Sequence, residues 1–132
     1  GIQSLKMNNE VSEIFSVEKF IPSAGQGVIC LQCRENDDEI LSILEKVNHK
    51  ETYQRANAER NVLKILEGDC ETAVGAHAKI YGNEISLETE LFSLDGSQRF
   101  YEKKVAPIEN AKELGTEVGK ILKFKSNNSY KR

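Results

Sequence analysis

The sequence predicts an α+β fold, a small domain with a three-stranded antiparallel sheet and helices on one face. Apolar and polar residues alternate over 74–80 and 85–91, and a third such segment lies near 99–105, which is typical of half-buried strands. Gly82-Asn83 and Asp95-Gly96 are hairpin signals between them. Apolar residues at helical spacing flank the three segments on both sides, and this order favours helices packed on one sheet face.

Residues 1–47 precede this domain and show a strand and a helix without a sheet of their own. The apolar run 28–33 predicts a short strand buried on both faces. Asp37 and Asp38 are N-cap candidates. Helical spacing follows at Ile40, Ile43, Leu44 and Val47. We therefore expect this part to belong to a larger body.

Residues 48–132 predict a more complete unit. Asn48 and Glu51 have the spacing of a capping box, and the helix they begin should run to about Glu67 and stop at Gly68. The last helix is predicted from Ala111, Leu114, Val118, Ile121 and Leu122. The tail 123–132 is basic and polar, and we expect little order beyond Phe124.

Two charged residues of the first long helix, Arg55 and Glu59, fall inside its apolar arc one turn apart. They predict a structural salt bridge, or else a helix that faces an interface or an anionic ligand. Arg60 lies at the edge of the arc, and Arg34 follows the run 28–33. An arginine in such a place is suited to bind a carboxylate.

Composition limits the functional classes. With 132 residues, 30% of them charged and 39% hydrophobic, the chain has the size and balance of one globular domain. A net charge of −3 argues against a nucleic-acid partner. No apolar run is long enough to span a membrane, and no secretory leader is visible. Three cysteines favour a reducing, cytoplasmic location, and the start at Gly1 indicates a fragment.

The candidate chemistry rests mainly on thiols. Cys30 and Cys33 have the spacing of a redox or metal pair, but a strand would point them to opposite faces, and no second cysteine pair completes a metal site. We therefore expect no metal. His49 and His77 have no nucleophile at a recognisable spacing. Cys70 follows a helix and precedes a strand, so we expect it on a loop, as an attachment point, a nucleophile or an ordinary small residue.

Several motifs in register extend this interpretation. In order, they are PSAGQG at 22–27, QCR at 32–34, NHKET at 48–52, AER at 58–60, LEGDC at 66–70, VGA at 74–76 and DGS at 95–97. Their order and spacing resemble the porphobilinogen deaminase (hydroxymethylbilane synthase) family. The resemblance covers essentially all of this chain, and it corresponds to the C-terminal part, less than half, of the family's enzyme.

The resemblance implies a domain organisation. The family has two doubly wound α/β lobes with the active-site cleft between them, and a third, small α+β domain. Residues 1–47 would then be a remnant of the lobes, the end of the second lobe and a return segment to the first. Residues 48–132 would be the C-terminal cofactor-anchoring domain. The partners of the chain would include the missing N-terminal domains.

The resemblance also implies a function. Cys70 would carry a dipyrromethane cofactor through a thioether, and Gln26, Gly27, Arg34 and Arg60 would bind the carboxylates of the cofactor and of the growing oligopyrrole chain. The catalytic aspartate would lie in the missing first domain, so this chain would hold no catalytic residue. The full-length enzyme would be a transferase of heme biosynthesis, condensing four porphobilinogen units, with loss of ammonia, to hydroxymethylbilane.

The 132-residue chain alone should be inactive and carry no cofactor. Two alternatives stay open. One is a non-catalytic binding or assembly module with the same fold, and the other is a thiol redox protein that uses Cys30 and Cys33.

Overall fold

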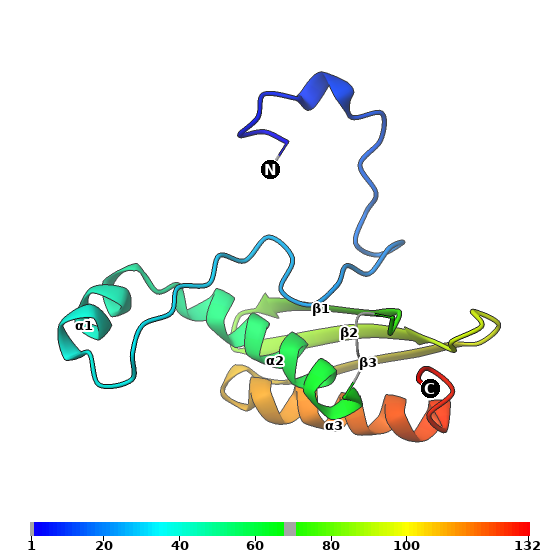
Figure 1. Ribbon diagram of the computed structural model, residues 1–132. Helices are drawn as coiled ribbons and strands as arrows, with labels where there is room; N and C mark the ends of the chain where they lie inside the picture. The colour runs from blue at the N-terminus through cyan, green and yellow to red at the C-terminus, as the bar shows by residue number, and fades with distance from the viewer. Residues whose placement is uncertain (1, 68–70) are drawn as a thin grey trace.

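The computed structural model describes residues 2–67 and 71–132. The chain forms an extended N-terminal arm and a packed α+β domain (Figure 1). The arm, residues 2–47, contains the short 3-10 helix η1 and the helix α1. The elements in order are η1 Asn8–Glu10, α1 Asp38–Val47, α2 Lys50–Leu66, β1 Val74–Tyr81, β2 Glu84–Phe92, β3 Arg99–Pro107, η2 Ile108–Asn110 and α3 Ala111–Ser126.

The three strands form one antiparallel sheet in the order β1-β2-β3. Gly82 and Asn83 alone separate β1 from β2, as the hairpin signal predicts, and Gly82 adopts φ +60°. Positive φ is the conformation that glycine supplies in tight hairpin turns. Because β2 is central, β1 and β3 each leave one edge of the sheet without a strand partner.

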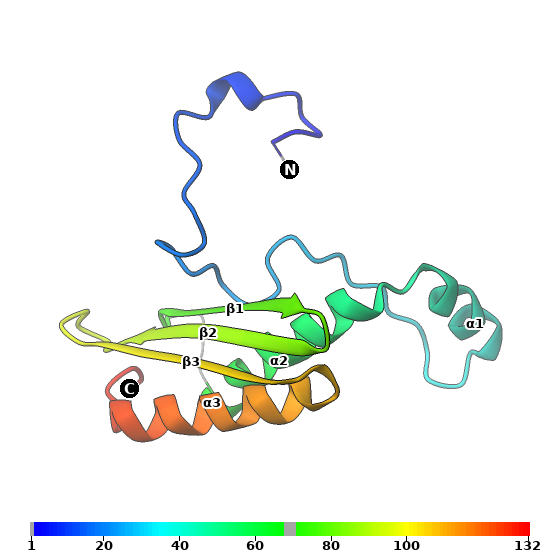
Figure 2. The same ribbon diagram turned by 180° about the vertical axis from the view of Figure 1, so that it is seen from behind.

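Helices α2 and α3 lie side by side on one face of the sheet (Figures 1 and 2). The alternating residues of the strands point into this layer, so Ala76, Ala78, Ile85, Leu87 and Leu91 are fully buried. Helix residues complete the core, among them Val62, Leu66, Leu114, Val118 and Leu122. The predicted fold class is confirmed for this domain.

The glycines of α3 allow α2 to approach closely. A Cβ on Gly115 would lie 2.2 Å from the Ala58 carbonyl oxygen, and one on Gly119 would lie 2.8 Å from the Ile65 Cβ. Contacts this short do not occur with real side chains, so the two helix backbones can meet only because both positions are glycine.

The start of α2 differs from the prediction. The N-cap is His49, whose Nδ1 accepts from the Thr52 N–H at 3.3 Å, rather than Asn48 with a Glu51 capping box. An imidazole nitrogen satisfies the same free N–H that a serine or asparagine oxygen would. The other end agrees with the sequence, because α2 ends at Leu66 and Glu67 is its left-handed C-cap.

The C-terminal tail is ordered, contrary to the expectation of little order beyond Phe124. Helix α3 runs to Ser126, and Asn127 ends it in the left-handed conformation. Tyr130 is only 1% exposed, and its hydroxyl donates to the Leu66 carbonyl oxygen at 2.6 Å. The buried Tyr130 ring, with its hydroxyl hydrogen-bonded, holds the tail against the domain. The polar composition of the tail did not indicate this contact.

The predicted strand at 28–33 is wrong. These residues form neither helix nor strand, and Ile29 and Leu31 are 88% and 61% exposed. A strand needs a neighbour for its backbone hydrogen bonds, and the sheet described has only the three strands of the other domain. Without a partner strand, the apolar run stays extended and open.

Helix α1 confirms the prediction from Asp37 and the apolar spacing. The Asp37 carboxylate accepts from the Ile40 N–H at 3.3 Å and caps the helix. The helix stands away from the sheet (Figure 1), and none of its residues is buried. Its apolar stripe therefore stays at least partly exposed to solvent.

Candidate functional site

Cys70, the first candidate from the sequence, lies outside the described residues, and so do Gly68 and Asp69. The described chain stops at Glu67, one residue past α2, and resumes at Glu71, shortly before β1 begins at Val74. The residues that contact these two flanks are described.

The C-terminal part of the chain contacts both flanks. Lys123 Nζ donates to the Ile65 carbonyl at 3.3 Å and to Glu67 Oε2 at 2.8 Å, and it lowers the pKa of Glu67. Lys131 Nζ lies 3.9 Å from the same carboxylate. Arg132 Nη2 lies 3.5 Å from Glu71 Oε2 on the other side. Basic side chains thus face the acids on both sides of the cysteine segment.

A second centre forms around Glu59, which is 4% exposed. Its Oε2 accepts from the Gly25 N–H at 2.8 Å, and its Oε1 accepts from the Ala78 N–H at 2.8 Å. Arg55 Nε donates to the Ala78 carbonyl at 2.8 Å. The predicted Arg55–Glu59 salt bridge is therefore corrected: both side chains bond to the backbone of β1, and Glu59 also holds the arm.

His77 lies beside this carboxylate, with Nδ1 at 3.9 Å from Glu59 Oε1. Burial is the main cause that lowers the pKa of His77, and Arg55 and Lys79 add to it, while Glu59 and Glu18 act in the opposite direction. Lys79 itself donates to Glu18 Oε1 at 2.6 Å, which links the arm to β1. The neutral imidazole is therefore the favoured form at neutral pH.

Gln26 and Gly27 follow directly on the Glu59 contact and are exposed. Gly25 and Gly27 adopt φ +74° and +73°, so the turn needs glycine at these two places. The segment before them is docked on β1, because the Ala76 N–H donates to the Pro22 carbonyl at 2.9 Å. The Gln26–Gly27 turn is thus exposed to solvent, while the segment just before it is held on β1.

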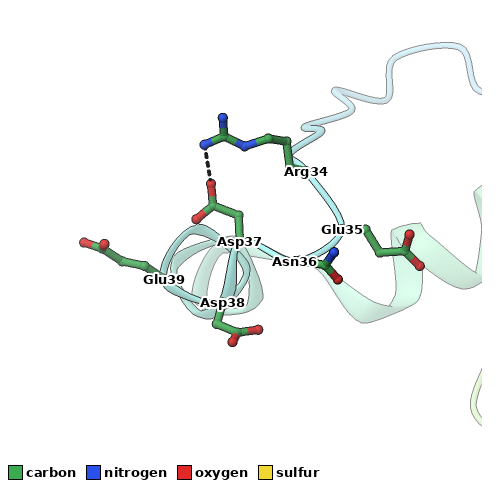
Figure 3. A pocket seen from close by; sticks show the side chains of 6 residues that line it. All are labelled: Arg34, Glu35, Asn36, Asp37, Asp38 and Glu39. Atoms are coloured by element: carbon green, nitrogen blue, oxygen red, sulfur yellow. Dashed lines mark hydrogen bonds and ion pairs between the residues drawn. The ribbon is translucent and has the colours of Figure 1, made fainter.

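The two candidate arginines are both exposed but lie on different elements. Arg34 precedes α1, its side chain is 90% exposed, and one nitrogen bonds to Asp37 Oδ2 at 3.0 Å (Figure 3). Arg34 and Asp37 line a shallow pocket together with Glu35, Asn36, Asp38 and Glu39. Arg60 lies on α2, next to Glu59 in sequence. Guanidinium groups open to solvent can accept a carboxylate ligand.

The cysteine pair Cys30 and Cys33 forms no defined site within the described residues. Cys30 is exposed and Cys33 half-buried; the argument that a strand would separate them fails, because no strand forms there. Among residues 2–67 and 71–132, no group of three or more His, Cys, Asp or Glu side chains could hold a metal ion. No helix within these ranges is long and apolar enough to cross a membrane.

Glu59 joins the 22–27 loop and the AER stretch of α2 to β1 at Ala78, and the VGA motif of β1 contacts the same loop through the Ala76 N–H and the Pro22 carbonyl. Arg34 stays apart from this group, at the start of α1. Sequence reasoning missed the role of Glu59 as a backbone acceptor and the buried Tyr130. An acid inside an apolar arc was the signal for the first; nothing in the tail's pattern indicated the second.

The fold and these residues define a class: a small α+β domain that carries a cysteine between its first helix and its first strand, joined to an arm that has no core of its own. The family model described as "Porphobilinogen deaminase, C-terminal domain" matches residues 53–123. The model described as "Porphobilinogen deaminase, dipyromethane cofactor binding domain" matches residues 1–42. The chain belongs to the porphobilinogen deaminase family.

Curated relatives agree. A porphobilinogen deaminase of Desulforamulus reducens is 35% identical over 122 residues, which cover 92% of this chain and 40% of that protein. One from Coxiella burnetii has the same identity and coverage. One from a Nostoc species is 32% identical over 123 residues, 93% of this chain and 38% of that protein. The chain therefore spans about 40% of the length of these relatives.

Proposed function

We propose that this chain is the C-terminal part of a porphobilinogen deaminase and that Cys70 is its covalent cofactor anchor. The whole enzyme condenses four porphobilinogen units head to tail, releases one ammonia for each, and frees hydroxymethylbilane. The observation that carries the proposal is that two models of one family match successive parts of the chain, over residues 1–42 and 53–123.

Thiol chemistry supports the proposed anchor role. The thiolate is the nucleophilic form of cysteine, and its addition to the electrophilic methylene carbon of a pyrrole unit, with uptake of one proton, makes a thioether. The bound dipyrromethane supplies the terminal pyrrole carbon on which condensation begins. Cys70 holds this group in place and keeps it on the protein when the product leaves.

The donor chemistry of the described residues fits such a cofactor. Pyrroles of this pathway carry acetate and propionate side chains, and carboxylates are bound best by guanidinium groups. Arg34 and Arg60 present exposed guanidinium groups, and the exposed Gln26–Gly27 turn can meet a ligand with its side-chain amide. In the proposed enzyme these groups bind and orient carboxylates, and the proton transfers belong to the lobes that precede this chain.

The domain assignment belongs to the same proposal. Residues 1–47 complete the second lobe and return to the first, and residues 48–132 form the domain that anchors the cofactor. The arm supports this assignment, because it leaves Ile14, Ile29 and Leu31 at least 61% exposed. Apolar side chains in such number on one segment mark a surface that another body covers.

Intact and peptide mass spectrometry of the full-length protein tests the anchor. We expect a dipyrromethane adduct on the peptide that contains Cys70, and its loss together with activity in Cys70→Ser. The matched control is Cys33→Ser, which should keep both adduct and activity. An active enzyme whose adduct sits on another residue would refute the anchor role. The 132-residue chain should form no bilane from porphobilinogen, and measurable turnover by it would refute the missing-lobe assignment.

A further inference from the structure

The docking of the 21–25 segment on the domain depends on three independent contacts. A Cβ on Gly75 would lie 2.6 Å from the Ile21 carbonyl oxygen, so the arm can pass over β1 only at a glycine. The Ala76 N–H donates to the Pro22 carbonyl at 2.9 Å. The Gly25 N–H donates to Glu59 at 2.8 Å. In each contact, the atom of the arm that is held is a backbone atom: the Ile21 carbonyl oxygen, the Pro22 carbonyl oxygen or the Gly25 nitrogen.

Glu59 differs from the other two contacts because it joins three elements. Its carboxylate belongs to α2, one oxygen accepts from β1 at Ala78, and the other accepts from the arm at Gly25. Both bonds measure 2.8 Å, and the side chain is 4% exposed. A buried carboxylate with both oxygens used on N–H donors is held in one orientation, and charge-assisted bonds of this kind are stronger than neutral ones.

We propose that Glu59 is a positioning residue for the binding loop: it sets the backbone of Gly25, and through it the exposed Gln26–Gly27 turn, relative to Arg60 on the next position of α2. This inference rests on the proposed function for the role of the loop in ligand binding. That Glu59 fixes the loop does not depend on the proposed function, because it is inferred from the hydrogen bonds of Gly25 and Ala78 to its two oxygens.

The substitution Glu59→Gln separates the two oxygens. An amide keeps one acceptor oxygen but replaces the other with an N–H donor, so either Gly25 or Ala78 loses its acceptor and faces a second donor. Because Ala78 belongs to a strand and Gly25 to an arm, the arm is the part expected to yield. Glu113→Gln is the matched control, since Glu113 is an exposed acid on α3 of the same domain.

Hydrogen–deuterium exchange of the 132-residue chain gives the first result. In Glu59→Gln we expect amides of residues 21–27 to exchange roughly tenfold faster or more, as loss of a buried hydrogen bond implies, while β2 and β3 stay as in the parent. Glu113→Gln should match the parent throughout. Equal exchange of the 21–27 segment in both variants would overturn the positioning role.

Gly75→Ala reaches the same segment from the other side and leaves Glu59 untouched. The added methyl group must displace the Ile21 backbone, so the same amides should exchange faster. If Glu59→Gln fails to fold, this variant still tests the proposal: an unchanged 21–27 segment in Gly75→Ala would show that the arm does not lie on β1 beside Gly75, and the positioning of Gly25 by Glu59 would be overturned with that docking.

Steady-state kinetics of the full-length enzyme gives the second result. In Glu59→Gln we expect KM for porphobilinogen to rise several-fold, with the Cys70 adduct still present by mass, whereas Glu113→Gln keeps the parent KM. A merely structural residue would change the thermal midpoint and leave KM at 25 °C in place. Faster exchange with an unchanged KM would overturn the link to ligand binding. A parent enzyme without turnover would instead refute the proposed function and leave the exchange result standing.

Discussion

At the residue scale, the peptide group of Ala78 shows how a helix can replace a strand. Ala78 lies on β1, at an edge of the sheet, where its N–H and carbonyl have no strand partner. Arg55 and Glu59, one turn apart on α2, bond to that carbonyl and that N–H. Unpaired edges invite pairing with other chains. The two charged side chains satisfy this edge at Ala78, and this role explains why they lie in an apolar arc.

His77 gives a pH prediction at the same scale. Its pKa is lowered in the folded chain from 6.5, chiefly by burial, so the folded state prefers the neutral ring. Above pH 6.5 the ring is mainly neutral in both the folded and the unfolded chain, so it does not lower the free energy of unfolding. As pH falls from 6.5 through the lower folded pKa, the unfolded chain binds the proton first and stability is lost.

Urea unfolding at several pH values measures this effect. We expect the free energy of unfolding of the parent to fall between pH 7 and pH 5 more steeply than that of His77→Gln, which cannot take up the proton. The ring signals of His77 in an NMR titration should move with a midpoint below 6.5. A midpoint at or above 6.5 would mean that attraction to Glu59 outweighs burial, and the predicted loss of stability would then be wrong.

At the element scale, the C-terminus of α2 is completed by side chains that lie 58 and 64 residues further along the chain. The last carbonyls of a helix have no partner within the helix. Tyr130 donates to the Leu66 carbonyl and Lys123 donates to the Ile65 carbonyl, while the Glu67 N–H bonds back to Leu63. Side chains from the end of the chain thus satisfy the last carbonyls of the helix that leads to the cysteine segment, beside its C-cap Glu67.

Tyr130→Phe tests this cap with little change in packing. The substitution leaves the Leu66 carbonyl buried without its donor, and such a loss costs about 1–3 kcal/mol of unfolding free energy. Tyr81→Phe is the matched control: Tyr81 is 62% exposed, so its stability should stay within about 0.5 kcal/mol of the parent. Denaturant unfolding compares the two. Equal free energies would show that the Tyr130 hydroxyl does not stabilise the helix end.

The elements also show where sequence patterns are sufficient. Alternation over β1 and β2 and the Gly82 turn are local signals, and the structure confirms them because neighbouring residues decide them. The strand expected at 28–33 does not form because a strand needs a partner for pairing, and the described residues offer this segment none. Tyr130 and Glu59 were missed for a related reason: their partners lie 64, 34 and 19 residues away in sequence, and no short-range pattern encodes such contacts.

At the scale of the whole molecule, the chain combines a closed domain with an open arm. The domain packs an apolar core between the sheet and two helices, whereas the arm has no buried apolar cluster within the described residues and leaves Phe15, Phe20 and much of the stripe of α1 exposed. The arm touches the domain mainly at 21–25 and at Glu18. Beside its packed domain, the chain therefore exposes an apolar surface of the kind that another protein body usually covers.

The exposed arm predicts self-association of the 132-residue chain, because apolar surface without its natural cover is buried between copies instead. Sedimentation velocity should show an apparent mass that rises with concentration. Ile29→Ser with Leu31→Ser removes two of the most exposed apolar side chains and should reduce the rise. Lys46→Ser with Lys50→Ser is the control and should leave it unchanged.

The same double change at Ile29 and Leu31 should leave the unfolding free energy of the domain nearly unaltered, since neither side chain is part of its core. In the full-length enzyme, by contrast, it should destabilise the assembly of the arm with the lobes and lower activity. A chain that stays monomeric at all concentrations, together with a full-length double variant of normal stability and activity, would contradict the assignment of the arm as a covered surface.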